Sequence, residues 1–184
     1  MEEDVLLAVL AENKTTVMRT LIFVAATLAS VSLSAQWDVS ASKDEMTGEV
    51  SSYCSSPTTA PTEVMSFPYG DTKGWIGIGC DGENEWVYAG FTNEPNLLDT
   101  EIGDGYNSIR TRIKFDDEIE TVNLVQTWSS KFLHFSNDKE IIEKIMKANT
   151  ILLELNWYGE GSTYFRFNGG GSTSAINQIR ESCK

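Results

Sequence analysis

Two neighbouring stretches of strict alternation constrain the fold of this chain more than any other feature. Between residues 109 and 115, mainly apolar side chains alternate with three basic ones, Arg110, Arg112 and Lys114. After Asp116 and Asp117 the alternation resumes, and the side expected to be buried carries Val122, Leu124 and Trp128. A period of two residues is typical of a strand with one buried and one solvated face. Residues 106–129 therefore predict a β-hairpin with a short acidic turn.

The rest of the chain after residue 35 shows similar segments. Further strands are expected over 36–42, 48–56, 75–80, 85–91, 132–135, 151–158 and 163–168. One helix is expected over 137–148, with Asn137 and Glu140 as a capping pair, and a second at the C-terminus, capped by Ser172, Thr173 or Ser174. Consecutive hairpins favour antiparallel pairing. We therefore expect a mainly β (α+β) domain, an antiparallel β-sandwich or curled sheet of about eight strands with two short helices.

The strand expected over 75–80 has an unusual composition. Trp75, Gly77 and Gly79 share one face, and glycines there would let another backbone approach closely. Trp75 and, on the next strand, Tyr88 are expected to point outward, where they could form an aromatic contact surface.

The N-terminal region has the layout of a secretory signal peptide. Arg19 precedes an apolar run that is too short to span a bilayer, and small residues follow up to Ala35. We expect cleavage near Ala35, one β-rich domain over 36–184, and a periplasmic or secreted location with no membrane span after cleavage. An amphipathic N-terminal helix is the alternative, and the sequence leaves open whether Met1 or Met18 is the start.

The acidic balance restricts the partners. The formal net charge is −13, and it becomes −11 without residues 1–35, which hold four acidic and two basic side chains. Phosphate-rich partners require positive charge. The composition therefore argues against nucleic acid and against an anionic membrane surface.

Three cysteines favour one disulfide bond in an exported protein. Cys80 lies on the inward face of its expected strand, and Cys183 on the inward stripe of the terminal helix. We expect a bridge between them, which would tie the C-terminal helix to the sheet and stabilise the fold by roughly 4–5 kcal/mol in the chain-entropy model. Two separately buried thiols are the alternative. Cys54 then stays free or pairs between molecules.

The order of several short motifs over residues 37–183 resembles the VasI/TagO family of small exported proteins associated with type VI secretion. These motifs are IGIGC, IRTRIKFDD, TWSS, YFRFNGG and a terminal helix ending in Cys, AINQIRESC. The resemblance implies an envelope accessory protein without known catalysis, and it supports the two-cysteine bridge.

Few residues suggest a catalytic centre. His134 is the only histidine, which excludes a histidine-based triad or a multi-histidine zinc site within one chain. The segment GGGSTS at 169–174 precedes a helix but lacks the lysine of a P-loop, so a turn into a capped helix is favoured.

Two groups of acids are candidate sites. Asp99, Glu101 and Asp104 alternate in a way that could bind calcium, although their spacing does not match an EF-hand loop, and no other cofactor is expected. Asp116, Asp117 and Glu118 could supply the acid and base of glycoside cleavage, but neighbouring residues on a tight turn point into water.

The basic stripe Arg110, Arg112 and Lys114 is the candidate binding surface. Cross-strand ion pairs with Glu118 and Glu120 are the structural interpretation, and docking of an acidic partner or glycan is the functional one. We therefore expect an exported, non-enzymatic binding or accessory protein, linked to type VI secretion or the cell envelope, with a protein or glycan partner. The alternatives are a carboxylate-dependent hydrolase of envelope polysaccharide and an inhibitor of a secreted enzyme.

Overall fold

The structure, a computed structural model, describes residues 36–82 and 84–183. These residues belong to one compact unit, Ser34–Lys184. The signal peptide expected within residues 1–35 lies outside the described residues. No helix in the described part of the chain is long and apolar enough to cross a membrane.

The described strands form a single antiparallel sheet that curls on itself, so the curled sheet is confirmed over the sandwich. The strand order is β1-β2-β3-β4-β8-β7-β6-β9-β10, with the short β5 paired to β6. The bounds of the strands are β1 Asp38–Lys43, β2 Val50–Ser55, β3 Gly74–Asp81, β4 Asn84–Phe91, β5 Thr100–Ile102, β6 Tyr106–Phe115, β7 Glu118–Thr127, β8 Phe132–Phe135, β9 Thr150–Trp157 and β10 Gly161–Asn168.

The predicted hairpin is confirmed as β6 and β7, which pair along their whole length. Val122 and Leu124 are buried as expected, because they lie opposite Thr111 and Ile109 of β6. The expectation for Trp128 is wrong. Pairing ends at Thr127, the chain turns away, and the Trp128 side chain is 56% exposed.

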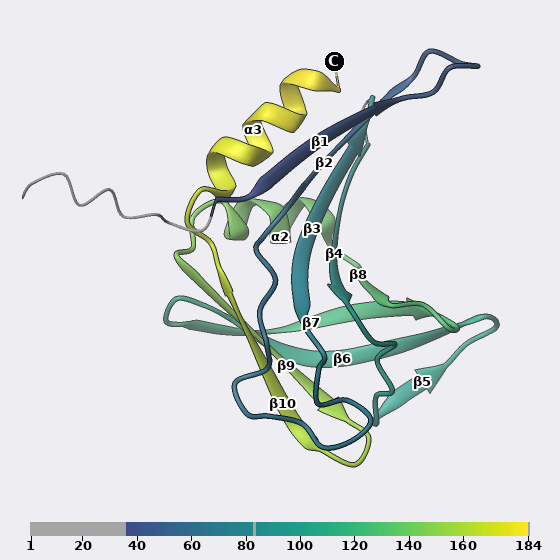
Figure 1. The fold of residues 1–184 in the computed structure, drawn as a ribbon, viewed down its shortest axis with the longest axis vertical. Coiled ribbons are helices and arrows are strands. Elements are labelled where there is room, and N and C mark those ends of the chain that lie inside the picture. The colour runs from purple at the N-terminus through teal and green to yellow at the C-terminus, as the bar shows by residue number, and fades with distance from the viewer. Residues whose placement is uncertain (1–35, 83, 184) are drawn as a thin grey trace, which may run out of the picture. The chain divides into compact units, whose positions relative to one another are not determined.

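The sheet curls where β8 joins its two halves. β8 pairs with β4 over only three residues and with β7 over only two, so the long strands on either side are free to cross at a steep angle (Figure 1). The loop between β2 and β3 runs from one half of the sheet to the other. It makes single bridges from Thr59 to Gly74 of β3 and from Pro61 to Phe165 of β10. Phe91, Trp157 and Phe165 fill the interior with edge-to-face and tilted contacts.

Two helices lie on the same side of strands β1–β4 (Figure 1). Helix α2, Asp138–Ile145, is shorter than expected, and Asn137 bonds the side chain of Glu140 instead of capping the backbone. An Asp138 carboxylate oxygen accepts the N–H of Val87 at 2.8 Å, where β4 has diverged from β8.

Helix α3, Ser172–Ser182, begins after Gly171, whose φ of 90° is left-handed. The predicted hydroxyl cap is wrong. Ser172 donates to the carbonyl of Ile145 at 2.9 Å and Thr173 to that of Met146, so both hydroxyls bind the C-terminal end of α2. The GGGSTS segment therefore holds the start of α3 against the C-terminal end of α2 by hydrogen bonds.

The disulfide bond between Cys80 and Cys183 is present, with a Cα–Cα distance of 6.2 Å. Cys80 lies at the end of β3, and Cys183 is the residue that follows α3. The bridge therefore ties the C-terminal helix to the sheet at the end of β3, as expected.

Candidate functional site

The face of the sheet opposite the helices is continuous across both halves, and we call it the outer face. One row of directly paired residues crosses it from β3 to β6: Gly77, Tyr88, His134, Val125 and Ser108. Residues opposite one another in neighbouring strands project to the same side. The aromatic residues of β3 and β4 and the basic residues of β6 therefore share one surface.

Three aromatic rings lie flat on this face, each over a glycine of the neighbouring strand. The pairs are Trp75 over Gly90, Tyr88 over Gly77 and Trp86 over Gly79. A Cβ atom placed on any of these glycines would lie 2.3–2.5 Å from a ring atom, closer than real Cβ atoms approach. The glycines do not admit another backbone, contrary to the sequence prediction, because the rings occupy that space.

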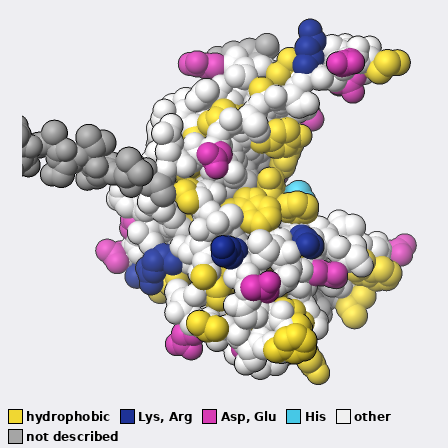
Figure 2. Space-filling view, viewed as in Figure 1, with side chains coloured by type: hydrophobic (Ala, Val, Ile, Leu, Met, Phe, Trp, Pro, Cys, Tyr) yellow, Lys and Arg dark blue, Asp and Glu magenta, His cyan; other side chains and the backbone are white. Residues whose placement is uncertain are grey.

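Two further rings stand upright beside the flat ones. Phe132 meets Tyr88 at 86° and Trp75 at 82°, and Tyr53 meets Trp86 at 70°. Phe132 is 39% exposed and Tyr53 is 37% exposed. Figure 2 shows hydrophobic side chains gathered beside the histidine in a hollow of the surface. These five rings form the aromatic platform: Tyr53, Trp75, Trp86, Tyr88 and Phe132.

His134 belongs to the rim of the platform. Its ring lies 5.8 Å from that of Tyr88 in a tilted arrangement, and the side chain is exposed. Burial among these rings raises the pKa of the Tyr88 hydroxyl above its ordinary value, while a hydrogen bond with Trp75 acts in the opposite direction. Tyr88 is therefore a neutral hydroxyl at physiological pH.

The basic stripe is partly paired, though not as predicted. Arg112 makes a two-pronged ion pair with Glu154 of β9, with N–O distances of 2.5 and 2.8 Å. Lys114 lies 3.5 Å from Asp117 on the turn. Arg110 makes no ion pair with any described residue. The hydrogen bond from Arg112 is the main cause that lowers the pKa of Glu154.

The predicted pairs with Glu118 and Glu120 are wrong for a reason of register. Both glutamates lie opposite buried residues of β6, Phe115 and Ile113, and so project to the other face of the sheet. Glu120 instead pairs with Lys144 of α2.

Of the acids in the β6–β7 turn, Asp116 has a structural role. Asp116, at φ 50°, accepts hydrogen bonds from the backbone N–H groups of Asn149 and Thr150, at 2.8–3.2 Å. Asp117 is fully exposed. The carboxylates of Asp116 and Asp117 therefore do not face one another across a cleft.

The proposed calcium ligands are not brought together. In the part of the chain that the structure describes, no group of three or more His, Cys, Asp or Glu side chains could hold a metal ion. Asp99 instead accepts a hydrogen bond from the side-chain amide of Asn156 at 2.5 Å.

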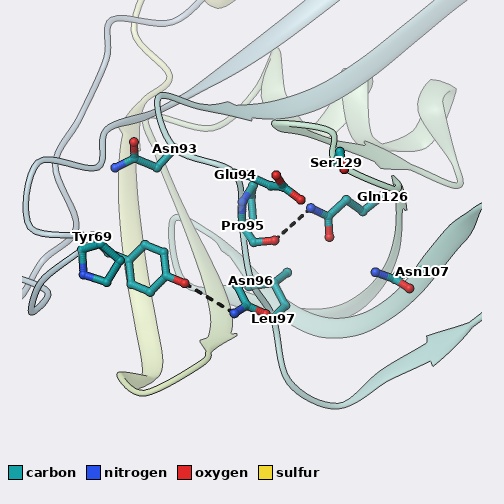
Figure 3. A pocket seen from close by; sticks show the side chains of 10 residues that line it. Tyr69, Asn93, Glu94, Pro95, Asn96, Leu97, Asn107, Gln126 and Ser129 are labelled. Carbon is teal, nitrogen blue, oxygen red and sulfur yellow. Dashed lines mark hydrogen bonds between the residues drawn. The ribbon is translucent and has the colours of Figure 1, made fainter.

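A second concave site, which the sequence did not suggest, lies on the other face of the sheet (Figure 3). This amide cleft has a volume of about 520 Å³. Its walls come from the loop between β2 and β3, the loop after β4, the start of β6 and the end of β7. Its lining is rich in side-chain amides: Asn93, Asn96, Asn107 and Gln126. These residues are scattered over three segments, so no local pattern marks them.

The sequence indicated only part of the aromatic platform. Trp75 and Tyr88 were expected to point outward, whereas Trp86, Phe132 and Tyr53 were missed. The pattern that could have found them is that each lies directly opposite a glycine of a neighbouring strand, because a glycine leaves a ring-sized gap on a strand face.

Comparison of the chain with family models, curated proteins and solved structures finds no match.

Proposed function

We propose that this chain is an exported, non-enzymatic binding protein that holds a polysaccharide of the cell envelope on its aromatic platform. The observation that carries the proposal is the flat position of Trp75, Trp86 and Tyr88 over glycines. Each ring has one face against the sheet, and its other face points away from it.

A flat ring matches the chemistry of a sugar. The face of an aromatic ring carries partial negative charge, and the C–H bonds on one face of a pyranose carry partial positive charge and little polarity. Three rings spread over two strands can contact successive sugars of an extended chain. The upright rings of Phe132 and Tyr53 flank the flat rings.

Charge and compartment support the same proposal. Arg110 shares the outer face and lacks an ion-pair partner among the described residues, so it is available to a carboxylate or hydroxyl of the glycan. The Cys80–Cys183 bridge favours an oxidising compartment. The resemblance to VasI/TagO proteins gives a separate reason to expect an accessory role in the envelope, in association with type VI secretion.

The test is co-sedimentation of the purified protein with insoluble peptidoglycan sacculi. We expect the protein to pellet with the sacculi and the double variant Trp75→Ala, Tyr88→Ala to stay in the supernatant. Trp128→Ala is the matched control, because Trp128 is exposed but lies outside the platform. Equal loss in the control, or no loss in the double variant, would contradict the proposal.

The same samples test the hydrolase alternative. The proposal predicts that no reducing ends are released from the sacculi during incubation. Release that is abolished by Asp117→Asn would favour catalysis instead.

A further inference from the structure

The amide cleft is a built site that is independent of the aromatic platform. Asn107 and Gln126 are directly paired across β6 and β7. They project to the core face of the sheet, whereas the next pair, Ser108 and Val125, projects to the outer face. The volume of about 520 Å³ lies within the range of about 300–1,000 Å³ typical of small-molecule sites.

Gln126 offers a hydrogen-bond acceptor to this cleft. The residue is only 3% exposed, and its NH₂ group donates to the carbonyls of Pro95 at 2.9 Å and Ser130 at 3.0 Å. Carbonyls only accept hydrogen bonds, so these contacts fix which end of the amide is nitrogen. The Oε1 atom accepts no hydrogen bond from any described residue, and it points into the cleft (Figure 3).

Two other amides of the lining use their donors in the same way. The NH₂ group of Asn93 donates to Asp71 at 3.0 Å and Thr72 at 2.9 Å, and that of Asn96 donates to the hydroxyl of Tyr69 at 3.4 Å. The groups that remain for a ligand are therefore mainly carbonyl oxygens. The Gln126 oxygen is open to the cleft and can accept a hydrogen bond there, so the lining favours a ligand rich in N–H or O–H groups.

The charge of the cleft selects among such ligands. Glu94 lies in the lining, and the described lining residues include no Lys, Arg or His. Lys131, beside the cleft, donates to the carbonyl of Thr92 at 2.7 Å. The segment 92–105 also carries Asp99, Glu101 and Asp104 without a basic residue. The ring of Tyr69, held edge-to-face on Trp157 at 5.5 Å, adds an aromatic wall that attracts cations.

We propose that the amide cleft binds a small organic cation, a primary ammonium or guanidinium group on a short chain. The N–H donors of the cation bond the Oε1 atom of Gln126, and its charge is balanced by Glu94. A bare metal ion would fill little of the volume, and the described residues hold no group of three metal-binding acids, histidines or cysteines there.

Titration calorimetry of the full chain with putrescine tests this inference, and 1,4-butanediol is the matched neutral probe with the same number of carbons. We expect saturable 1:1 binding of putrescine and none of the diol. Glu94→Gln should weaken binding about tenfold, since it removes a bond to a charged group. Glu101→Gln makes the same charge change on β5, away from the lining, and should leave the affinity unchanged.

A further titration distinguishes the two sources of such a cation, a free amine and a lysine side chain of a partner protein. Tighter binding of Nα-acetyl-lysine-N-methylamide than of putrescine would assign the cleft to a lysine side chain of a partner protein, and the reverse order would assign it to a free amine. Three results would overturn the inference: no binding of either amine, equal binding of the diol, or equal weakening by Glu101→Gln. None of them bears on the aromatic platform.

Discussion

Burial is the main influence on the chemistry of Cys54, the free cysteine of β2. The side chain is 2% exposed and lies in the core. Removal from water is the main cause that raises the pKa of its thiol to about 12, and the nearby charge of Glu85 adds to the effect. Of the two states left open by the sequence, the folded structure favours the free thiol over a bond between molecules.

Cys54 should therefore make stability depend on alkaline pH. The pKa of the thiol is raised in the folded state, so its contribution is complete below the unfolded value of 9.0 and is lost as the pH rises toward about 12. We expect the midpoint of denaturant unfolding to fall across this window. Cys54→Ala should flatten that part of the profile, and a profile unchanged by this substitution would show that the thiol ionises freely in the fold.

The structural role of Asp116 could not be predicted from the sequence. Its neighbours suggested either a solvated turn or an acid–base pair. The structure uses its carboxylate to hold the N–H groups of Asn149 and Thr150, at 2.8–3.2 Å. Those residues lie more than thirty positions along the chain, so no local pattern could reveal the contact.

At the scale of elements, the pairing of rings with glycines should make β3 and β4 intolerant of small changes. A methyl group on Gly79 would lie 2.5 Å from the ring of Trp86. We expect Gly79→Ala to destabilise the protein by about 1–3 kcal/mol, because the ring must leave its place.

A double-mutant cycle separates this contact from the effect of alanine on the strand. With Trp86→Ala already present, Gly79→Ala should cost little, because nothing remains to clash with the methyl group. Urea unfolding of the unsubstituted protein, the two single variants and the double variant measures the coupling free energy between Gly79 and Trp86. Additive losses would show that the ring does not rest on the glycine.

Local patterns predicted most elements of the fold. Alternation identified the β6–β7 hairpin, and the inward positions of Cys80 and Cys183 predicted the bridge. The missing information was long-range register. The position of β8 between β4 and β7 unites the aromatic and basic halves of the outer face, and it depends on only five residue pairs. Nothing in the order of the elements along the chain specifies that junction.

For the whole molecule, the disulfide bond is the largest single constraint. It joins residues 103 positions apart and fixes α3 against the sheet. Replacing Cys80 and Cys183 together by alanine should lower the free energy of unfolding by roughly 4–5 kcal/mol, because the unfolded chain gains the freedom that the closed loop removes. Calorimetry of this double variant beside the disulfide-intact Cys54→Ala protein checks the prediction. Equal thermal midpoints would mean that packing alone holds α3 in place.

The central claim is that a glycan lies on the flat rings of the outer face, and fluorine NMR tests it most directly. The chain has five tryptophans, which 5-fluorotryptophan labels as five signals. On addition of soluble peptidoglycan strands, the signals of Trp75 and Trp86 should shift, while those of the exposed Trp128 and the buried Trp37 and Trp157 should not. Shifts at Trp128 alone, or none at Trp75 and Trp86 at saturating glycan, would contradict the claim.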